Sequence, residues 1–216
     1  MRIRNVILDW SGTMVNDLAP VLKTTNHVLR SCGQPPLTLA EFRRDFCLPV
    51  REFYRDRAPG LTLAELEHRF LAEYVKHRDE IQLLPHTRAF LEFCASEQRT
   101  VFVASSADLG TYDRQMRRFD LHRFITKPYI GIDDKTRQIH RILDENRLSP
   151  ADTLFVGDME HDIAAGKAGS VHTCAVLSGY SHVEALRALQ PDLICEHLGE
   201  LQTILTRQET THGINR

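Results

Sequence analysis

The sequence contains no long apolar run, no excess of charge and no cysteine spacing typical of a metal site. No apolar stretch approaches the roughly 20 residues that span a membrane, so we expect no membrane partner. A formal net charge of -2 over 216 residues gives no electrostatic basis for binding nucleic acid. Five scattered cysteines favour reduced thiols and a cytoplasmic location. The first residues enter a strand pattern directly, so we expect no signal peptide.

The composition is that of an ordinary globular protein, with 42% hydrophobic and 26% charged residues. Its length suits one domain with a large insertion or two small domains. After the apolar run that ends at Leu8, short apolar segments alternate with helical periodicity from about residue 83 onward. The segments that predict strands are 101–104, 124–126, 153–156, 172–176 and 193–195. This alternation implies right-handed crossovers and a mostly parallel α/β sheet.

Residues 16–82 show helical spacing and no strand signal. The first predicted helix begins at Leu18, with Asp17 as a candidate N-cap. Because the strand before this segment belongs to the sheet, we expect an all-helical insertion that covers the ligand crevice. The predicted domains are a core of residues 1–15 and 83–216 and a helical cap of residues 16–82.

Polar residues follow two of the predicted strands at the point where each strand ends. Asp9 ends the first apolar run, and Gly12 and Thr13 follow it in a turn. Ligands of parallel α/β sheets bind beyond the carboxyl ends of the strands, so we expect these three residues in a crevice. Ser105 and Ser106 end the second run at the start of a predicted helix, where hydroxyl and N–H groups can hold an oxyanion.

A third strand end carries two carboxylates, in the sequence GDMEHD. Asp158 and Asp162 are four residues apart and lie on one side of a helical turn. Asp9 and Asp158 together can bind a hard divalent cation, most naturally Mg²⁺. Lys135 opens a predicted helix, from which it could pair with a carboxylate and a phosphate. For His161, within the same motif, we expect a place on the helix surface.

The order of Asp9, Ser105, Lys135 and Asp158 resembles the four motifs of the haloacid dehalogenase superfamily. The helical insertion after the first motif resembles the cap of phosphoglycolate phosphatase and beta-phosphoglucomutase. The resemblance covers nearly the whole chain. It implies a Rossmann-like core, a Mg²⁺ cofactor and an aspartate nucleophile that forms an aspartyl-phosphate. The implied activity is hydrolysis of a small anionic phosphorylated metabolite.

The resemblance also implies roles for single residues. Asp9 is the nucleophile and a metal ligand, and residue 11 offers its backbone carbonyl to the metal. Ser105 holds the phosphoryl group, with Gly12, Thr13 and Ser106 beside the substrate. Lys135 steadies the nucleophile and the transferring charge.

In the fourth motif, the resemblance makes Asp158 a metal ligand, and Asp162 supports the metal directly or through another ligand. Lys127, which precedes a proline, is a rival for the third motif. We prefer Lys135 because it opens the helix immediately before the strand that leads to Asp158.

One position departs from the family pattern. Family phosphatases carry a general acid–base aspartate two residues after the nucleophile, where this chain has Ser11. General acid–base catalysis contributes about 10² to 10⁴-fold, so the loss of this carboxylate matters. Phosphonoacetaldehyde hydrolases carry Ala in a context similar to DWSGT, but they need a cap lysine, and this cap has only Lys23 and Lys76. We therefore rank a C–P hydrolase below a phosphate monoester hydrolase. The alternatives are a C–P hydrolase, a dehalogenase-like enzyme, or a catalytically weak phosphate-binding or regulatory relative.

The cap contains a proline-broken basic segment, FCLPVREFYRDR, with Arg51, Tyr54 and Arg55. Guanidinium groups above a phosphate crevice would select an anionic substrate. The alternative is a solvated basic helix face. We expect these three residues to take part in substrate choice, and we leave the oligomeric state open between monomer and dimer.

Overall fold

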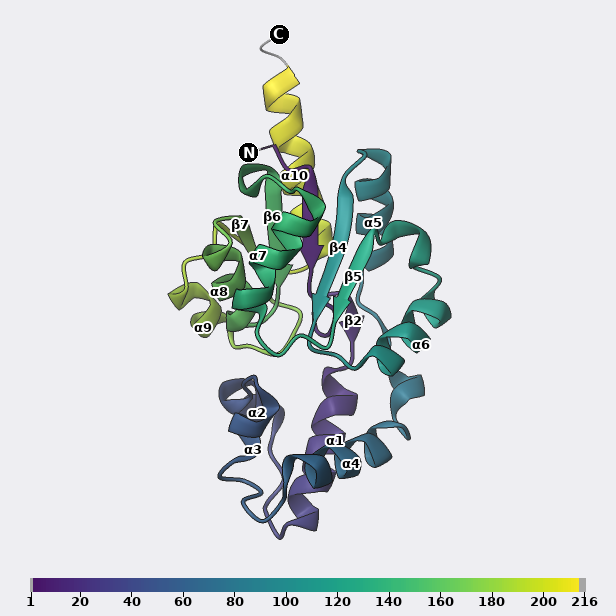
Figure 1. The fold of residues 1–216 in the computed structure, drawn as a ribbon, viewed down its shortest axis with the longest axis vertical. Coiled ribbons are helices and arrows are strands. Elements are labelled where there is room, and N and C mark those ends of the chain that lie inside the picture. The colour runs from purple at the N-terminus through teal and green to yellow at the C-terminus, as the bar shows by residue number, and fades with distance from the viewer. Residues whose placement is uncertain (1, 214–216) are drawn as a thin grey trace.

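A six-stranded parallel sheet forms the centre of the computed structural model, which describes residues 2–213 and their side chains as far as residue 208 (Figure 1). The strand order is β5-β4-β1-β6-β7-β8. The strands are β1 (Asn5–Leu8), β4 (Thr100–Ser105), β5 (Lys127–Ile130), β6 (Thr153–Gly157), β7 (His172–Val176) and β8 (Leu193–Cys195). The predicted α/β class with a mostly parallel sheet is confirmed.

The register of the central strands brings their carboxyl ends together. Leu8, the last residue of β1, lies opposite Val103 of β4 on one side and Val156 of β6 on the other. All three strands run in the same direction. The residues that follow them, which include Asp9 and Asp158, therefore meet at one edge of the sheet.

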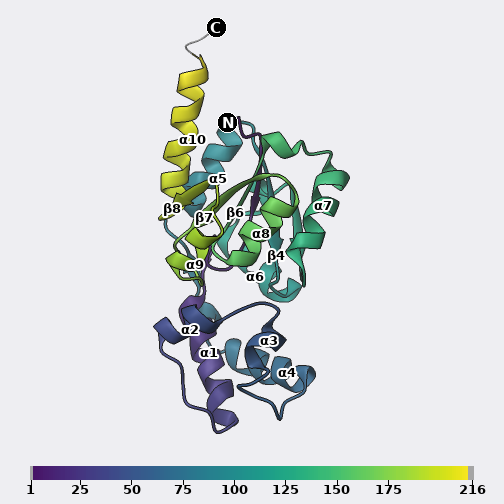
Figure 2. The ribbon, with the colours of Figure 1, turned by 90° about the vertical axis from the view of Figure 1, so that its left-hand side faces the viewer.

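Helices cover both faces of the sheet, which explains the continuous apolar strand sequences. Val6 and Leu8 point toward α5 (Thr87–Ser96), α6 (Leu109–Phe119) and α10 (Leu198–Gly213). Ile7 points to the opposite face, where α7 (Lys135–Asn146) and α8 (Glu160–Ala168) pack. Helix α9 (Val183–Ala188) packs against α8 on that same face. Figure 2 shows α10 and α7 on opposite sides of the strands.

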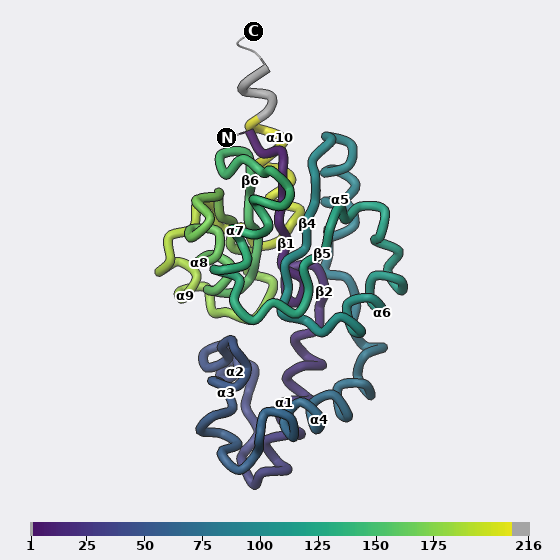
Figure 3. The backbone as a smooth tube through the Cα atoms, viewed as in Figure 1, coloured from purple at the N-terminus to yellow at the C-terminus, as the bar shows by residue number. Residues whose placement is uncertain are grey.

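Four helices lie beyond the carboxyl edge of the sheet (Figures 1 and 3). They are α1 (Leu18–Ser31), α2 (Leu39–Asp45), α3 (Val50–Tyr54) and α4 (Leu63–Tyr74). The starts of α2 and α4 are fixed by capping boxes, formed by Thr38 with Glu41 and by Thr62 with Glu65. These helices share an apolar cluster of their own, and the core contributes Met159 and Tyr180 to it.

Two short strands join the helical segment to the core. β2 (Val15–Asn16) pairs antiparallel with β3 (Gln82–Leu83). The expectation that residues 16–82 contain no strand is wrong at these two ends, because two-residue strands leave no periodic signal. We propose to divide the chain here, into a core of residues 1–15 and 83–216 and a cap of residues 16–82.

Three further differences from the sequence predictions concern local structure. The strand predicted at 124–126 is wrong: a 3-10 helix ends at Phe124, Ile125 and Thr126 are irregular, and β5 begins at Lys127. Helix α10 was not predicted, although Leu198, Leu201 and Leu205 keep helical spacing. Asp17 precedes α1, but its side chain does not cap the helix. The short 3-10 helices are Arg78–Glu80, His122–Phe124 and Pro150–Asp152.

Within the described part of the chain, no helix combines the length and the apolar composition that crossing a membrane requires.

Candidate active site

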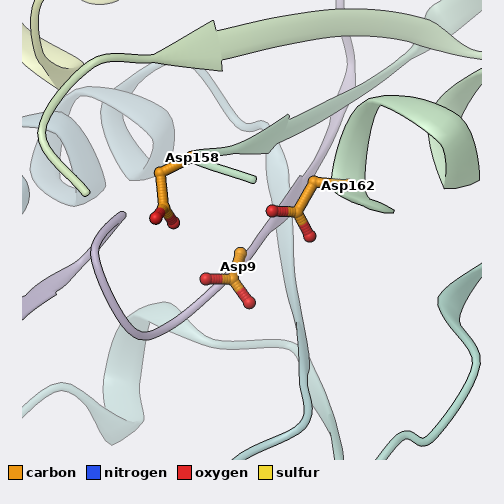
Figure 4. Close-up of side chains that lie close together, drawn as sticks. All are labelled: Asp9, Asp158 and Asp162. Carbon is orange, nitrogen blue, oxygen red and sulfur yellow. The ribbon is translucent and has the colours of Figure 1, made fainter. Parts of the chain in front are cut away.

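Three buried carboxylates face one another at the carboxyl edge of the sheet (Figure 4). Asp9 follows β1, Asp158 follows β6, and Asp162 lies in the first turn of α8. Each offers one oxygen, and these three oxygens lie within 4.8 Å of one another. The fold thus gathers the three aspartates that the sequence singled out as metal ligands.

The ammonium group of Lys135 lies against two of these carboxylates. Its Nζ donates to Oδ1 of Asp9 and, at 2.6 Å, to Oδ1 of Asp162. Lys135 is the first residue of α7, as predicted, and the side chain of Asp134 caps that helix. Burial lowers the pKa of Lys135, but Asp162 and Asp9 outweigh this effect and raise it. The lysine therefore remains charged.

The cluster holds three carboxylates and one ammonium, so its charges do not balance when all three carboxylates are ionised. Burial raises the pKa of Asp9 and Asp162, and Lys135 opposes the rise. The pKa of Asp158 is raised well above its ordinary value, by burial and then by the two neighbouring carboxylates. A divalent cation would remove this repulsion, and carboxylate oxygens are the ligands that Mg²⁺ prefers. The donor set therefore fits Mg²⁺.

Two hydrogen bonds and two closely approaching glycines hold Asp158 in place. Its Oδ1 accepts a hydrogen bond from Oγ1 of Thr13 and its Oδ2 accepts one from the N–H of Tyr180, each at 2.8 Å. A Cβ atom on Gly12 or Gly179 would lie 2.4 Å and 1.9 Å, respectively, from Oδ2 of Asp158. Thr13 therefore binds a carboxylate in this structure and does not line the cavity described next.

A cavity of about 220 Å³ lies between the strand ends and the cap helices. Among the predicted site residues, Asp9, Ser11, Ser105 and Ser106 line it. The other lining residues are Asp17, Val21, Phe46, Leu48, Val50, Phe70, Leu71, Tyr74, Ala107, Asp108, Thr111, Gln115, Met159, His161 and Tyr180. The predicted nucleophile, Asp9, thus borders the cavity.

Ser105 and Ser106 do not stand at the start of a helix, which corrects that part of the prediction. Ser105 is the last residue of β4, and α6 begins only at Leu109, with Asp108 as its N-cap. The Oγ of Ser105 accepts a hydrogen bond from the N–H of Ala107 at 3.1 Å. A tight turn beyond the strand, and not a helix N-terminus, therefore orients this hydroxyl beside the cavity.

Sequence reasoning missed Asp17 and Tyr180 as parts of the site. Asp17 is only 3% exposed, and burial raises its pKa to about 6, against hydrogen bonds from Ser11 and Tyr180. The hydroxyl of Tyr180 lies 2.9 Å from Oδ1 of Asp17. The position of Asp17 directly after the first motif is a sequence signal that it lies near the site. Its partner Tyr180 lies in the distant segment after β7, and periodicity does not predict that contact.

His161 lines the cavity, so its expected place on the helix surface is wrong. Its Nε2 lies 3.2 Å from Oδ1 of Asp162. Burial, and then the charge of Lys135, lower the pKa of His161 to about 3, so the ring is neutral. A neutral imidazole thus borders the cavity close to the three aspartates.

The structure does not bring Arg51, Tyr54 and Arg55 to the cavity. Both arginine side chains are largely exposed and lie near the carboxylate of Glu52, 2.7 Å away for Arg55 and 3.9 Å away for Arg51. Tyr54 is buried in the cap, where its hydroxyl donates to Oγ1 of Thr25 at 3.2 Å. The short helix α3 turns its apolar side inward, and this leaves the two arginines facing solvent.

Lys127, the rival of Lys135, lies away from the carboxylates. It begins β5 and its Nζ pairs with Oε2 of Glu145 at 2.8 Å, on the surface. Of the two lysines, only Lys135 contacts Asp9 in this structure.

The sequence matches the family of haloacid dehalogenase-like hydrolases over residues 6–176. The chain belongs to this family. A phosphoglycolate phosphatase of Aliivibrio fischeri is 34% identical, over 94% of this chain and 97% of that protein. Pyrophosphatase PpaX of Listeria welshimeri is 25% identical, over 96% of this chain and 99% of that protein. The resemblance to the haloacid dehalogenase superfamily is thus confirmed, and the protein is a hydrolase.

Solved structures share the fold of this family member over almost its whole length. A haloacid dehalogenase-like hydrolase from Streptococcus pneumoniae gives a TM-score of 0.79 at 20% identity, over 94% of this chain and 98% of that one. A hydrolase from Pseudomonas syringae also gives 0.79, at 16% identity, over 95% and 98%. At these identities the likeness shows the Rossmann-like fold of haloacid dehalogenase-like hydrolases and nothing further.

Proposed function

We propose that this protein is a Mg²⁺-dependent phosphatase for small phosphorylated metabolites, with Asp9 as the nucleophile. The observation that carries the proposal is the position of Asp9, which lines the cavity while Lys135 contacts its carboxylate. The names of the relatives, phosphoglycolate phosphatase and pyrophosphatase, support phosphoryl chemistry. A proposed cytoplasmic location agrees with the free state of the five cysteines. We propose no nucleic-acid or membrane partner, and a monomer or a dimer.

The proposed reaction has two displacements at phosphorus. A carboxylate oxygen of Asp9 bonds to phosphorus, the bond to the leaving oxygen breaks, and that oxygen gains a proton. Water then attacks the aspartyl-phosphate, loses a proton and frees inorganic phosphate and the carboxylate. In this proposal Ser105 binds the phosphoryl oxygens, while Lys135 compensates charge on Asp9. Bound Mg²⁺, held by Asp9, Asp158 and Asp162 with the backbone carbonyl of Ser11, would neutralise phosphoryl charge.

We propose that Ser11 makes turnover slow. Its hydroxyl stands where family phosphatases carry a carboxylate, and a hydroxyl is a poor proton acceptor at neutral pH. Hydrolysis of the aspartyl-phosphate should therefore be slow, and substrates with good leaving groups should react best. In a Ser11→Asp variant we expect kcat to rise.

The cap lysines offer no support for C–P hydrolysis through a Schiff base. Lys23 pairs with Glu80 at 2.5 Å and Lys76 pairs with Glu73 at 2.6 Å. Neither lysine is among the residues that line the cavity. We therefore favour P–O cleavage over C–P cleavage.

Release of inorganic phosphate from phenyl phosphate, with Mg²⁺ or with a chelator, tests the proposal. We expect activity only with Mg²⁺, and loss of at least about 10³-fold in Asp9→Asn, because the nucleophile is gone. Asp56→Asn is the matched control, since Asp56 is 82% exposed on the cap surface, and it should keep full activity. Full activity in Asp9→Asn, or no Mg²⁺-dependent hydrolysis of any phosphate ester, would overturn the proposal.

A further inference from the structure

The part of the cavity wall that the cap helices and their connecting loops supply is apolar. Besides Asp17, seven cap residues line the cavity: Val21, Phe46, Leu48, Val50, Phe70, Leu71 and Tyr74. Tyr74 contributes the only polar side-chain group among these seven. The polar lining comes from Asp17, from the strand ends at Asp9 and Ser105 with the residues that follow them, and from α6, α8 and Tyr180. A bound phosphate ester with its phosphoryl group at Asp9 would therefore place its leaving group against an apolar surface.

No lysine or arginine is among the residues that line this cavity in the described chain. Lys135, the nearest ammonium to Asp9, is occupied by two carboxylates. Two cap arginines form ion pairs outside the cavity. Arg57 pairs with Asp45 and Arg55 pairs with Glu52, each at 2.7 Å. A second negative charge on the leaving group would therefore meet no lysine or arginine side chain in the cavity wall.

The charges that do line the cavity would repel a second anion. Asp17 is buried beside Ser11, and Asp108 lies on the rim of the same cavity. A carboxylate or a second phosphate in the leaving group would lose solvation beside the buried Asp17 without gaining a partner, which is costly. The wall therefore discriminates against 2-phosphoglycolate and pyrophosphate, substrates suggested by the names of the relatives.

The volume suits a small leaving group. An apolar cavity of about 150 Å³ holds one benzene molecule, and this cavity measures about 220 Å³ in total. A phosphoryl group fills part of that space, which leaves room for roughly one ring or a short branched chain. Aromatic rings already form part of the wall, with Phe46 and Tyr180 5.4 Å apart between their centroids.

From this cavity we infer that the substrate is a phosphate monoester whose leaving group is uncharged, largely apolar and about the size of one ring. The inference rests on the proposed phosphatase function. It assigns the choice of substrate to the apolar cap residues and not to Arg51 and Arg55.

Benzyl phosphate, 2-phosphoglycolate and pyrophosphate form the test set, with phenyl phosphate as the reference substrate. Benzyl phosphate and phosphoglycolate both release an alkoxide. A difference in kcat/KM between them therefore reflects contacts with the cavity more than the reactivity of the leaving group. We expect kcat/KM for benzyl phosphate to exceed that for phosphoglycolate by at least about tenfold, from burial of the ring. Equal or reversed preference, with phenyl phosphate hydrolysed, overturns this inference and leaves the phosphatase proposal standing.

Binding of non-hydrolysable phosphonates keeps the test independent of turnover. Calorimetry with Mg²⁺ present should show benzylphosphonate binding at least about tenfold more tightly than phosphonoacetate. Phosphonoacetate binding as tightly as benzylphosphonate overturns the inference even where the enzyme turns over slowly. Failure to hydrolyse every ester, with the binding preference intact, instead contradicts the proposed function.

Two exposed leucines of α4 provide a matched pair of variants. Leu71 is 51% exposed and lines the cavity, whereas Leu63 is 49% exposed and does not. Leu71→Arg places a cation at the cavity and should shift the benzyl phosphate to phosphoglycolate ratio of kcat/KM toward phosphoglycolate by about fivefold. Leu63→Arg should leave this ratio unchanged. An equal shift in both variants, or none in Leu71→Arg, counts against the inference.

Discussion

A Cβ atom on Gly12 would lie 2.4 Å from Oδ2 of Asp158. Gly12 also has a φ of +79°, in the left-handed region where glycine is favoured. The turn after β1 and the carboxylate after β6 therefore contact each other with no space for a side chain. This contact links the segment that carries the proposed nucleophile to a proposed metal ligand.

The first prediction is that Gly12→Ala displaces Asp158. We expect affinity for Mg²⁺ and kcat/KM to fall by at least about tenfold, and the free energy of unfolding to fall by about 1–3 kcal/mol from the strained φ. Gly33→Ala is the control, because Gly33 has a φ of +72° and open space around it. The control should lose stability alone. If both variants lose activity equally, the contact with Asp158 is not what matters.

The second prediction concerns the lysine shared by two carboxylates. Lys135→Met leaves Asp9 and Asp162 buried without their cation, and breaking such a pair costs about 3–5 kcal/mol. We expect this loss by chemical denaturation in a chelator at neutral pH. Activity should fall by at least about 10²-fold, because a donor near the developing charge is removed. Activity within threefold of wild type would show that Lys135 has only a structural role.

The third prediction concerns the pH dependence of the stability that the ion pair between Lys127 and Glu145 contributes. Hydrogen bonds from Lys127, Arg141 and Tyr129 lower the pKa of Glu145 to about 2. A lowered carboxyl pKa stabilises the fold above the ordinary value near 4.5, and this contribution is lost as pH falls toward 2. Lys127→Met should therefore lower Tm slightly at pH 7 and less at pH 3, with kcat/KM unchanged. A large loss of activity would restore Lys127 as a candidate for the third motif.

The fourth prediction concerns the basic segment of the cap. Arg51→Ala and Arg55→Ala should leave KM unchanged for every ester tested, because both side chains are solvated outside the cavity. Tyr54→Phe should cost about 1 kcal/mol of stability, from the lost hydrogen bond to Thr25. A steady-state comparison across the substrate panel checks all three variants. A rise in KM limited to anionic leaving groups in either arginine variant would mean that the arginine contacts substrate.

Much of the fold follows from local sequence signals. β1, β4 and β6 are apolar runs that end in polar residues, and their parallel arrangement brings Asp9 and Asp158 together. Lys135 was predicted from its place at a helix start, and the structure puts it against Asp9. These features depend on short-range patterns and on the few connections that a parallel sheet allows.

The cavity could not be predicted in the same way. Tyr180 and Asp17 are far apart in the sequence but form a hydrogen bond in the fold. No periodic pattern in the sequence predicts this contact. Arg51 faces solvent because α3 buries its opposite, apolar face. Which face is buried depends on how the cap helices pack, and the local sequence does not determine this. Substrate choice is therefore the property that sequence patterns describe least well.

The central claim is that Asp9 carries the phosphoryl group. The most direct measurement is rapid acid quench with phenyl phosphate and Mg²⁺, followed by mass spectrometry of the peptide that contains Asp9. The account predicts a burst of phenol near one equivalent per active site, because hydrolysis of the intermediate is slow, and a phosphoryl adduct on Asp9. The adduct should be absent in Asp9→Asn. Steady turnover without a burst and without an adduct on Asp9, or an adduct on another residue, would contradict the account.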